Sequence, residues 1–90
     1  MFRLWAKVWE KGRMVRDITI ENGDLSLNRT KKIFLALEDA CKAFDLSVPI
    51  WLDHNISEFQ KVSKVRFHQD NFMEEIDFDY LELQVIEEDS

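Results

Sequence analysis

The stretch that decides the fold is Tyr80-Leu81-Glu82-Leu83-Gln84-Val85-Ile86. It lies in the most acidic part of the chain, because residues 70–90 hold nine carboxylates and no Lys or Arg, a net charge of −9. Residues 1–69 hold all 12 Lys and Arg against nine carboxylates, a net charge of +3. Such an asymmetry is typical of an acidic interaction tail. The stretch is too apolar for a disordered tail, however, and its alternation predicts a half-buried strand.

A second alternating stretch, Lys64-Val65-Arg66-Phe67-His68, is basic and supplies a matching strand. Opposite charges across two strands stabilise by about 0.2–1 kcal/mol per pair. We therefore expect one sheet whose strands neutralise each other. The apolar face of this strand pair holds Val65, Phe67, Leu81, Leu83 and Val85. The polar face holds Lys64, Arg66, His68, Tyr80, Glu82, Gln84 and Ile86.

Residues 2–9 and 13–21 predict a β-hairpin, and the hydrophobic pattern predicts its register. A two-residue loop, Lys11-Gly12, would pair Leu4 with Thr19 and so mix apolar and polar groups on one face. A three-residue loop, Glu10-Lys11-Gly12, instead gives the pairs Phe2–Ile20, Leu4–Ile18 and Val8–Met14, and we expect this loop. The inner face then holds Phe2, Leu4, Ala6, Val8, Met14, Ile18 and Ile20, with Arg16 as a misfit. The outer face holds Arg3, Trp5, Lys7, Trp9, Arg13, Val15, Asp17 and Thr19.

Two helices are predicted between the strand pairs. The first covers residues 28–45 and ends before Pro49. Ser26 and Asn28 are both candidate caps, and we favour a start near Asn28. Its apolar stripe is Ile33, Phe34, Leu37, Ala40, Cys41 and Phe44. An apolar connector, residues 49–52, then tucks under the sheet edge. A short helix over residues 56–62 follows, with Asn55 and Glu58 resembling a capping box and with Ile56, Phe59 and Val62 facing inward.

The expected fold is α+β, a single domain of residues 1–90 with the element order ββααββ. Strands over 63–68 and 79–87 complete a four-stranded, mainly antiparallel sheet. Residues 70–77 join them as a long hairpin connection or as two short turns, and Phe72, Ile76 and Phe78 anchor this segment to the body. Both helices pack on one sheet face. The strand order 2-1-4-3 is preferred because it places the two most apolar strands at the centre.

Composition limits the classes of function. Cys41 is the single cysteine, so no internal disulfide forms and a reducing compartment is expected. The longest apolar run, residues 33–37, is far shorter than the ~20 residues that span a bilayer, and the amino terminus shows no export pattern. We expect a cytoplasmic protein that does not bind membranes. The net charge of −6 opposes general attraction to nucleic acid.

No catalytic motif is present, and we expect neither an enzyme nor a cofactor. Cys41 lies on the apolar helix stripe, which predicts an inert buried thiol. A metal site would have to be assembled from scattered carboxylates and the two histidines, Asp53, His54, His68, Asp70, Asp77 and Asp79, whose spacings match no ligand pattern. A pair of carboxylates among Glu74, Glu75, Asp77 and Asp79 would need desolvation for acid–base catalysis. An enzyme or metal-binding protein therefore remains only an alternative.

The aromatic residues of the outer face give the best functional lead. Trp5 and Trp9 flank Lys7, and exposed tryptophan clusters are typical of interfaces. Unless the segment 46–62 folds over them, we expect a binding surface formed by Trp5, Trp9, Arg3, Lys7 and Tyr80. Its expected partner is another protein or a second copy of the chain, as in a homodimer. The alternative is single-stranded nucleic acid stacked on the same aromatic and basic face, which Asp17 and Glu82 would disfavour.

Three segments are familiar together: residues 3–7 (Arg-Leu-Trp-Ala-Lys), residues 49–55 (Pro-Ile-Trp-Leu-Asp-His-Asn) and residues 78–87 (Phe-Asp-Tyr-Leu-Glu-Leu-Gln-Val-Ile-Glu). With them the chain resembles, over nearly its whole length, a family of short uncharacterised proteins from low-GC Gram-positive bacteria. The resemblance implies a stand-alone cytoplasmic bacterial protein. It brings no activity, ligand or catalytic residue.

Overall fold

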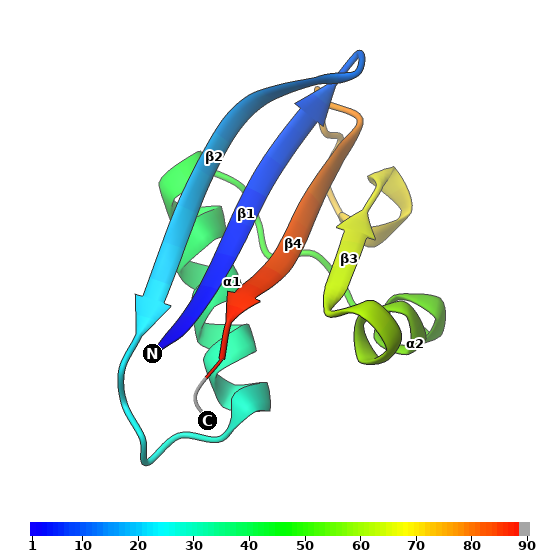
Figure 1. Ribbon diagram of the computed structural model, residues 1–90. Coiled ribbons are helices and arrows are strands. Elements are labelled where there is room, and N and C mark those ends of the chain that lie inside the picture. The colour runs from blue at the N-terminus through cyan, green and yellow to red at the C-terminus, as the bar shows by residue number, and fades with distance from the viewer. Residues whose placement is uncertain (89–90) are drawn as a thin grey trace.

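The computed structural model describes residues 1–88 of the chain. In chain order the elements are β1 (Phe2–Glu10), β2 (Arg13–Asn22), α1 (Arg29–Phe44), α2 (Asp53–Val62), β3 (Lys64–Phe67), the 3-10 helix η1 (Gln69–Asn71) and β4 (Tyr80–Glu87). The strands form one antiparallel sheet in the order β2-β1-β4-β3. Figure 1 shows α1 behind this sheet and α2 next to β3 at the edge of the sheet. The predicted α+β fold, the ββααββ order and the strand order are confirmed.

The core lies between the inner face of the sheet and α1, with α2 closing it beside β3. The two central strands supply four of its fully buried side chains, Leu4, Ala6, Leu81 and Leu83. Alternation along each strand sends these residues to one face. The remaining buried apolar residues are Phe2, Val8, Ile33, Ala36, Leu37, Ala40, Cys41, Phe44, Phe59, Val65, Phe67 and Phe72.

The loop of the first hairpin differs from the prediction. Glu10 pairs with Arg13, so the loop contains two residues, Lys11 and Gly12, with φ of 51° and 76°. Two successive left-handed residues are the requirement of a type I′ hairpin turn. The backbone N–H of Lys11 donates to Asp79 (2.8 Å), which holds the non-glycine residue in this conformation.

A β-bulge explains why the two-residue loop still keeps the apolar face intact. Trp9 pairs with Met14 but Val8 pairs with Arg16, so one residue of β2 is extra. Beyond the bulge the pairs are Phe2–Asn22, Leu4–Ile20 and Ala6–Ile18. The predicted pairs Phe2–Ile20, Leu4–Ile18 and Val8–Met14 are therefore wrong. Met14 consequently faces Trp9 on the outer face instead of the core.

Arg16 faces inward and has a specific role there. Its guanidinium donates to the carbonyl oxygens of Phe44 (3.0 Å) and Ala43 (3.4 Å) at the end of α1. It also lies over the Phe44 ring, 4.7 Å from the ring centroid. A cation at the carboxyl end of a helix is favourable, because the last carbonyl groups lack partners within the helix.

The start of α1 agrees with the prediction, because the Asn28 side chain accepts from the backbone N–H of Lys31 (2.8 Å). The helix ends at Phe44, followed by Asp45 in the left-handed region. Contrary to the prediction, Phe34 does not reach the core. It is 47% exposed, on the side of α1 that faces α2.

The second helix begins earlier than predicted, at Asp53, and its N-cap is Leu52. Asn55 is fully buried inside its first turn, where its side chain accepts from Leu52 N (3.0 Å) and donates to Arg66 O (3.2 Å). It also accepts from Asn71 (2.6 Å), so a buried amide pair ties α2 to η1. Of the three residues predicted to face inward, only Phe59 is buried; Ile56 and Val62 are exposed.

The connection between β3 and β4 is anchored as predicted. Phe72 is buried, Ile76 and Phe78 pack against the core, and the two phenylalanine rings meet edge to face at 5.9 Å. None of the helices within residues 1–88 has the length and apolar content that crossing a bilayer requires.

Candidate protein-binding surface

The outer face is the sheet face opposite the helices, and in residues 1–88 no helix covers it (Figure 1). Register places its side chains in rows that cross the sheet. One row alternates in charge across all four strands and consists of Asp17, Lys7, Glu82 and Arg66. The row on one side of it holds Met14, Trp9 and Tyr80, with His68 beside Tyr80; the row on the other side holds Thr19, Trp5, Gln84 and Lys64.

Glu82 is the centre of this surface. It is only 2% exposed although it lies on an uncovered sheet face. Its carboxylate accepts from Arg66 Nε (3.0 Å) and Trp9 Nε1 (3.2 Å), and Lys7 Nζ lies 3.3 Å away. Lys7 is itself 6% exposed and donates to the Gln84 side chain (2.8 Å). A buried carboxylate is tolerated here because several donors compensate its desolvation.

The charge state of Glu82 follows from these contacts. Burial by itself would raise the pKa of the carboxyl group, but hydrogen bonds from Arg66, Lys7 and Trp9 together hold the pKa below its ordinary value. The same hydrogen bond raises the pKa of the Arg66 guanidinium. Glu82 is therefore ionised at neutral pH and acts as a fixed acceptor that orients Lys7, Arg66 and the Trp9 indole.

Aromatic rings close the surface over the buried charges. Trp5 donates from Nε1 to Asp17 (2.9 Å), and Lys7 Nζ lies 3.9 Å from the centre of its ring. Trp9 stacks on Tyr80 with 6.2 Å between ring centroids, and Arg66 covers the Tyr80 ring at 4.8 Å. Both indoles are half-buried, and Met14 beside Trp9 is 41% exposed. The indoles are held in fixed orientations, which lowers the entropy cost of docking.

The five residues predicted for the binding surface all lie on this face. Trp5, Trp9 and Tyr80 are half-buried, and Arg3 is exposed and pairs with Glu21 (3.0 Å) and Glu87 (3.3 Å). Lys7 lies on the same face but is buried, with its Nζ over the Trp5 ring. The segment 46–62 packs on the opposite side, where Trp51 meets Phe67 edge to face at 4.9 Å, so it does not cover Trp5 and Trp9.

The sequence did not identify Glu82 as the centre of the surface. Alternation and register do place Glu82 opposite Arg66, which is the available signal. Convergence of Lys7, Trp9 and Arg66 on one carboxylate depends on side-chain conformations and on the pairing of β1 with β4, two strands far apart in the chain.

The residues considered for catalysis or metal binding are dispersed. Cys41 is buried in the core, and burial raises the pKa of its thiol to about 11. Within residues 1–88 no group of three or more His, Cys, Asp or Glu side chains is arranged to hold a metal ion. Asp77 lines an open hollow of about 460 Å³ together with Glu10, Asp45 and Arg16, but Arg16 is already bonded to the end of α1. His54 and His68 lie outside this hollow.

No protein-family model matches the chain, and no curated protein or solved structure matches it at a significant level.

Proposed function

We propose that this protein is a non-catalytic binding module whose outer face docks on a second copy of the same chain. The observation that carries the proposal is the pair of half-buried indoles, Trp5 and Trp9, on a sheet face that no described helix covers. Tryptophan and tyrosine dominate binding energy at interfaces because their large rings are buried with little loss of side-chain entropy.

Charge favours a second copy as the partner. Within residues 1–88 the outer face is balanced, since its charged side chains are Arg3, Lys7, Lys64 and Arg66 against Asp17, Glu21, Glu82 and Glu87. The chain as a whole has a net charge of −6. Two copies therefore avoid mutual repulsion best when they meet through this face. Two-fold self-association is also the commonest form of oligomer.

The size of the face predicts a weak complex. Four strands at ~4.8 Å spacing and about eight residues at ~3.3 Å rise cover roughly 19 × 26 Å. This projected area of about 500 Å² per copy gives about 1,000 Å² for a dimer, at the lower limit for a specific interface. We therefore expect a Kd in the micromolar to millimolar range.

Sedimentation velocity from about 1 μM to about 1 mM protein tests the proposal. The wild type should shift from monomer to dimer, and Trp5→Gln/Trp9→Gln should stay monomeric. Phe34→Gln is the matched control, because it removes an exposed aromatic side chain from the helical layer and should dimerise like the wild type. A wild type that is monomeric at about 1 mM, or a Phe34→Gln variant that loses dimerisation as well, contradicts docking through the outer face.

A nucleic-acid partner is disfavoured by the ion pairing of the face. Lys7 and Arg66 both contact Glu82, and Arg3 contacts two carboxylates. Phosphate binding would have to replace these contacts, and it weakens steeply as salt rises. Titration of tryptophan fluorescence with a single-stranded oligonucleotide at low and high salt should show no salt-sensitive binding.

A further inference from the structure

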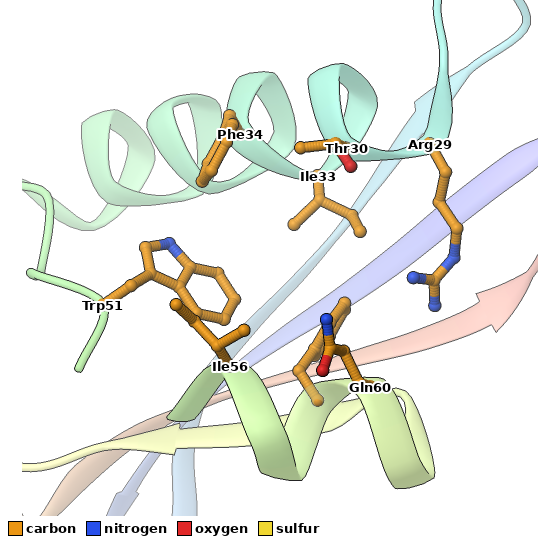
Figure 2. A pocket seen from close by; sticks show the side chains of 8 residues that line it. Arg29, Thr30, Ile33, Phe34, Trp51, Ile56 and Gln60 are labelled. Atoms are coloured by element: carbon orange, nitrogen blue, oxygen red, sulfur yellow. The ribbon is translucent and has the colours of Figure 1, made fainter. Parts of the chain in front are cut away.

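A cleft of about 290 Å³ lies between α1 and α2, on the opposite side of the molecule from the outer face (Figure 2). Its walls are apolar. Ile33 and Phe34 project from α1, Ile56 and Phe59 from α2, and the Trp51 ring stands between the helices at one end. Phe34 is 47% and Ile56 42% exposed, so the chain leaves these side chains in contact with solvent.

The aromatic end of the cleft is rigid. Trp51 meets Phe59 edge to face at 5.6 Å, Phe67 at 4.9 Å and Phe34 at 6.2 Å. Its indole nitrogen is buried and, within residues 1–88, donates to no hydrogen-bond acceptor. In Figure 2 this nitrogen lies on the side of the ring that faces α1. The Trp51 end of the cleft therefore presents an indole ring fixed by packing and suited to an apolar ligand group.

The other end of the cleft is polar and positively charged. Arg29 and Gln60 line it, and none of the acidic side chains of residues 1–88 lines the cleft. Arg29 opens the first turn of α1, which contains no acidic residue, so its guanidinium adds to the positive end of the helix dipole. An anion at this end would meet the guanidinium of Arg29.

Glu88 of the chain already places a carboxylate on Arg29. It accepts from Arg29 Nε, while one terminal nitrogen of Arg29 donates to Ser63 (3.0 Å). The guanidinium has five N–H donors. The contacts within residues 1–88 use Nε and one terminal nitrogen, so further donors are available to a ligand. Both partners of the Arg29–Glu88 pair are exposed, and such pairs contribute little stability and exchange readily.

We propose that the cleft binds a small monocarboxylate with an apolar tail, its carboxylate on Arg29 and its tail against Trp51. A volume of about 290 Å³ accommodates about ten non-hydrogen atoms at ~30 Å³ each. Octanoate has this size and is the probe of choice. An open cleft of this kind gives an expected Kd of about 0.1–1 mM.

Nuclear magnetic resonance titration of the full chain with octanoate tests the proposal, with the three indole N–H signals as reporters. The signal of Trp51 should move, and those of Trp5 and Trp9 on the outer face should not. Octanamide, which has the same shape without the charge, should bind at least about tenfold more weakly because it lacks the charge-assisted hydrogen bond.

Three variants separate a specific carboxylate site from general attraction. Arg29→Gln should weaken octanoate binding at least about tenfold. Lys31→Gln removes a cation from the same helix turn but outside the cleft, and it should change the Kd less than about twofold. Glu88→Gln should tighten binding about two- to fivefold, because it removes the internal carboxylate that competes for Arg29.

Several outcomes would overturn the proposal: no shift of Trp51 at about 5 mM octanoate, equal affinity for octanamide, or equal losses in the Arg29 and Lys31 variants. Movement of the Trp51 signal on simple dilution of the protein would instead identify a second copy as the occupant of the cleft. Because the outer face and the cleft have different tryptophans as reporters, the experiments test the ligand site and the self-docking surface independently.

Discussion

Replacing Glu82 with leucine removes the centre of the outer face and leaves the buried charge of Lys7 without its anion. Glu82 is 2% and Lys7 6% exposed, so the variant leaves the Lys7 ammonium desolvated without its anion. Breaking a buried ion pair costs about 3–5 kcal/mol for this reason. Lys7 keeps its hydrogen bond to Gln84 (2.8 Å) and Arg66 is largely exposed, so the lower end of the range applies.

A loss of about 3 kcal/mol is a large part of the ~5–15 kcal/mol that stabilises a domain. In a domain of this size it lowers the melting temperature by about 12–24 °C. Urea unfolding followed by circular dichroism should show a midpoint lower by about 1–3 M, with an unchanged slope.

The matched control is the double variant Lys7→Met/Glu82→Leu, which replaces the buried pair with apolar side chains of similar volume. Such replacements are near neutral or stabilising, so its stability should return to within about 1 kcal/mol of the wild type. The coupling between the two positions should then exceed about 1.5 kcal/mol. A double variant that loses as much as the two single variants together would refute the view that Lys7 and Glu82 form one buried unit.

Three further predictions concern stability. The folded-state pKa of Glu82 lies below its ordinary value of 4.5. The stability that ionised Glu82 contributes is therefore full above pH 4.5 and is lost as the pH falls through the folded pKa. In urea titrations at stepped pH, the wild type should lose more stability below about pH 4.5 than Glu82→Gln does. Leu4→Ala should cost about 2–5 kcal/mol in the same assay, since Leu4 is fully buried between β2 and β4, and a cost below about 1 kcal/mol would place it outside the core. Gly12→Ala should destabilise by about 1 kcal/mol, because alanine is strained at a φ of 76°, although a Cβ there would meet no neighbouring atom; a neutral result would argue against the two-residue loop.

Sequence patterns predicted the parts of the fold that depend on periodicity. Alternation in residues 80–86 identified β4 inside an acidic stretch, and helical spacing with Asn28 as the cap identified α1. The hairpin register failed for a different reason. The bulge opposite Val8 and Trp9 lets a two-residue loop coexist with an aligned apolar face, and a comparison of regular registers cannot detect an extra residue.

The cleft and the Glu82 centre were beyond prediction because both depend on how elements approach one another. Phe34 and Ile56 lie on apolar stripes that predict burial, yet both are about half exposed where α1 and α2 stand apart. The connector between the two helices is held at Ile50, whose two backbone polar groups bond the Asn71 side chain and backbone at 2.8 and 2.7 Å. The distance between two helices produces no periodic pattern in the sequence.

The distribution of charge connects the fold to the proposed docking. Two carboxylates of the acidic end are neutralised by pairing across the sheet, since Glu82 meets Lys7 and Arg66 and Glu87 meets Arg3. Among the described residues four cations and four anions thus cancel on the outer face, and the net charge of −6 is carried by residues other than these eight. Two copies that approach through other parts of their surfaces repel each other because both carry net negative charge there. Electrostatic repulsion is therefore smallest when they meet through the balanced outer face. Lowering the salt concentration, which lengthens the range of repulsion, should therefore weaken the dimer only slightly if the copies meet through this face.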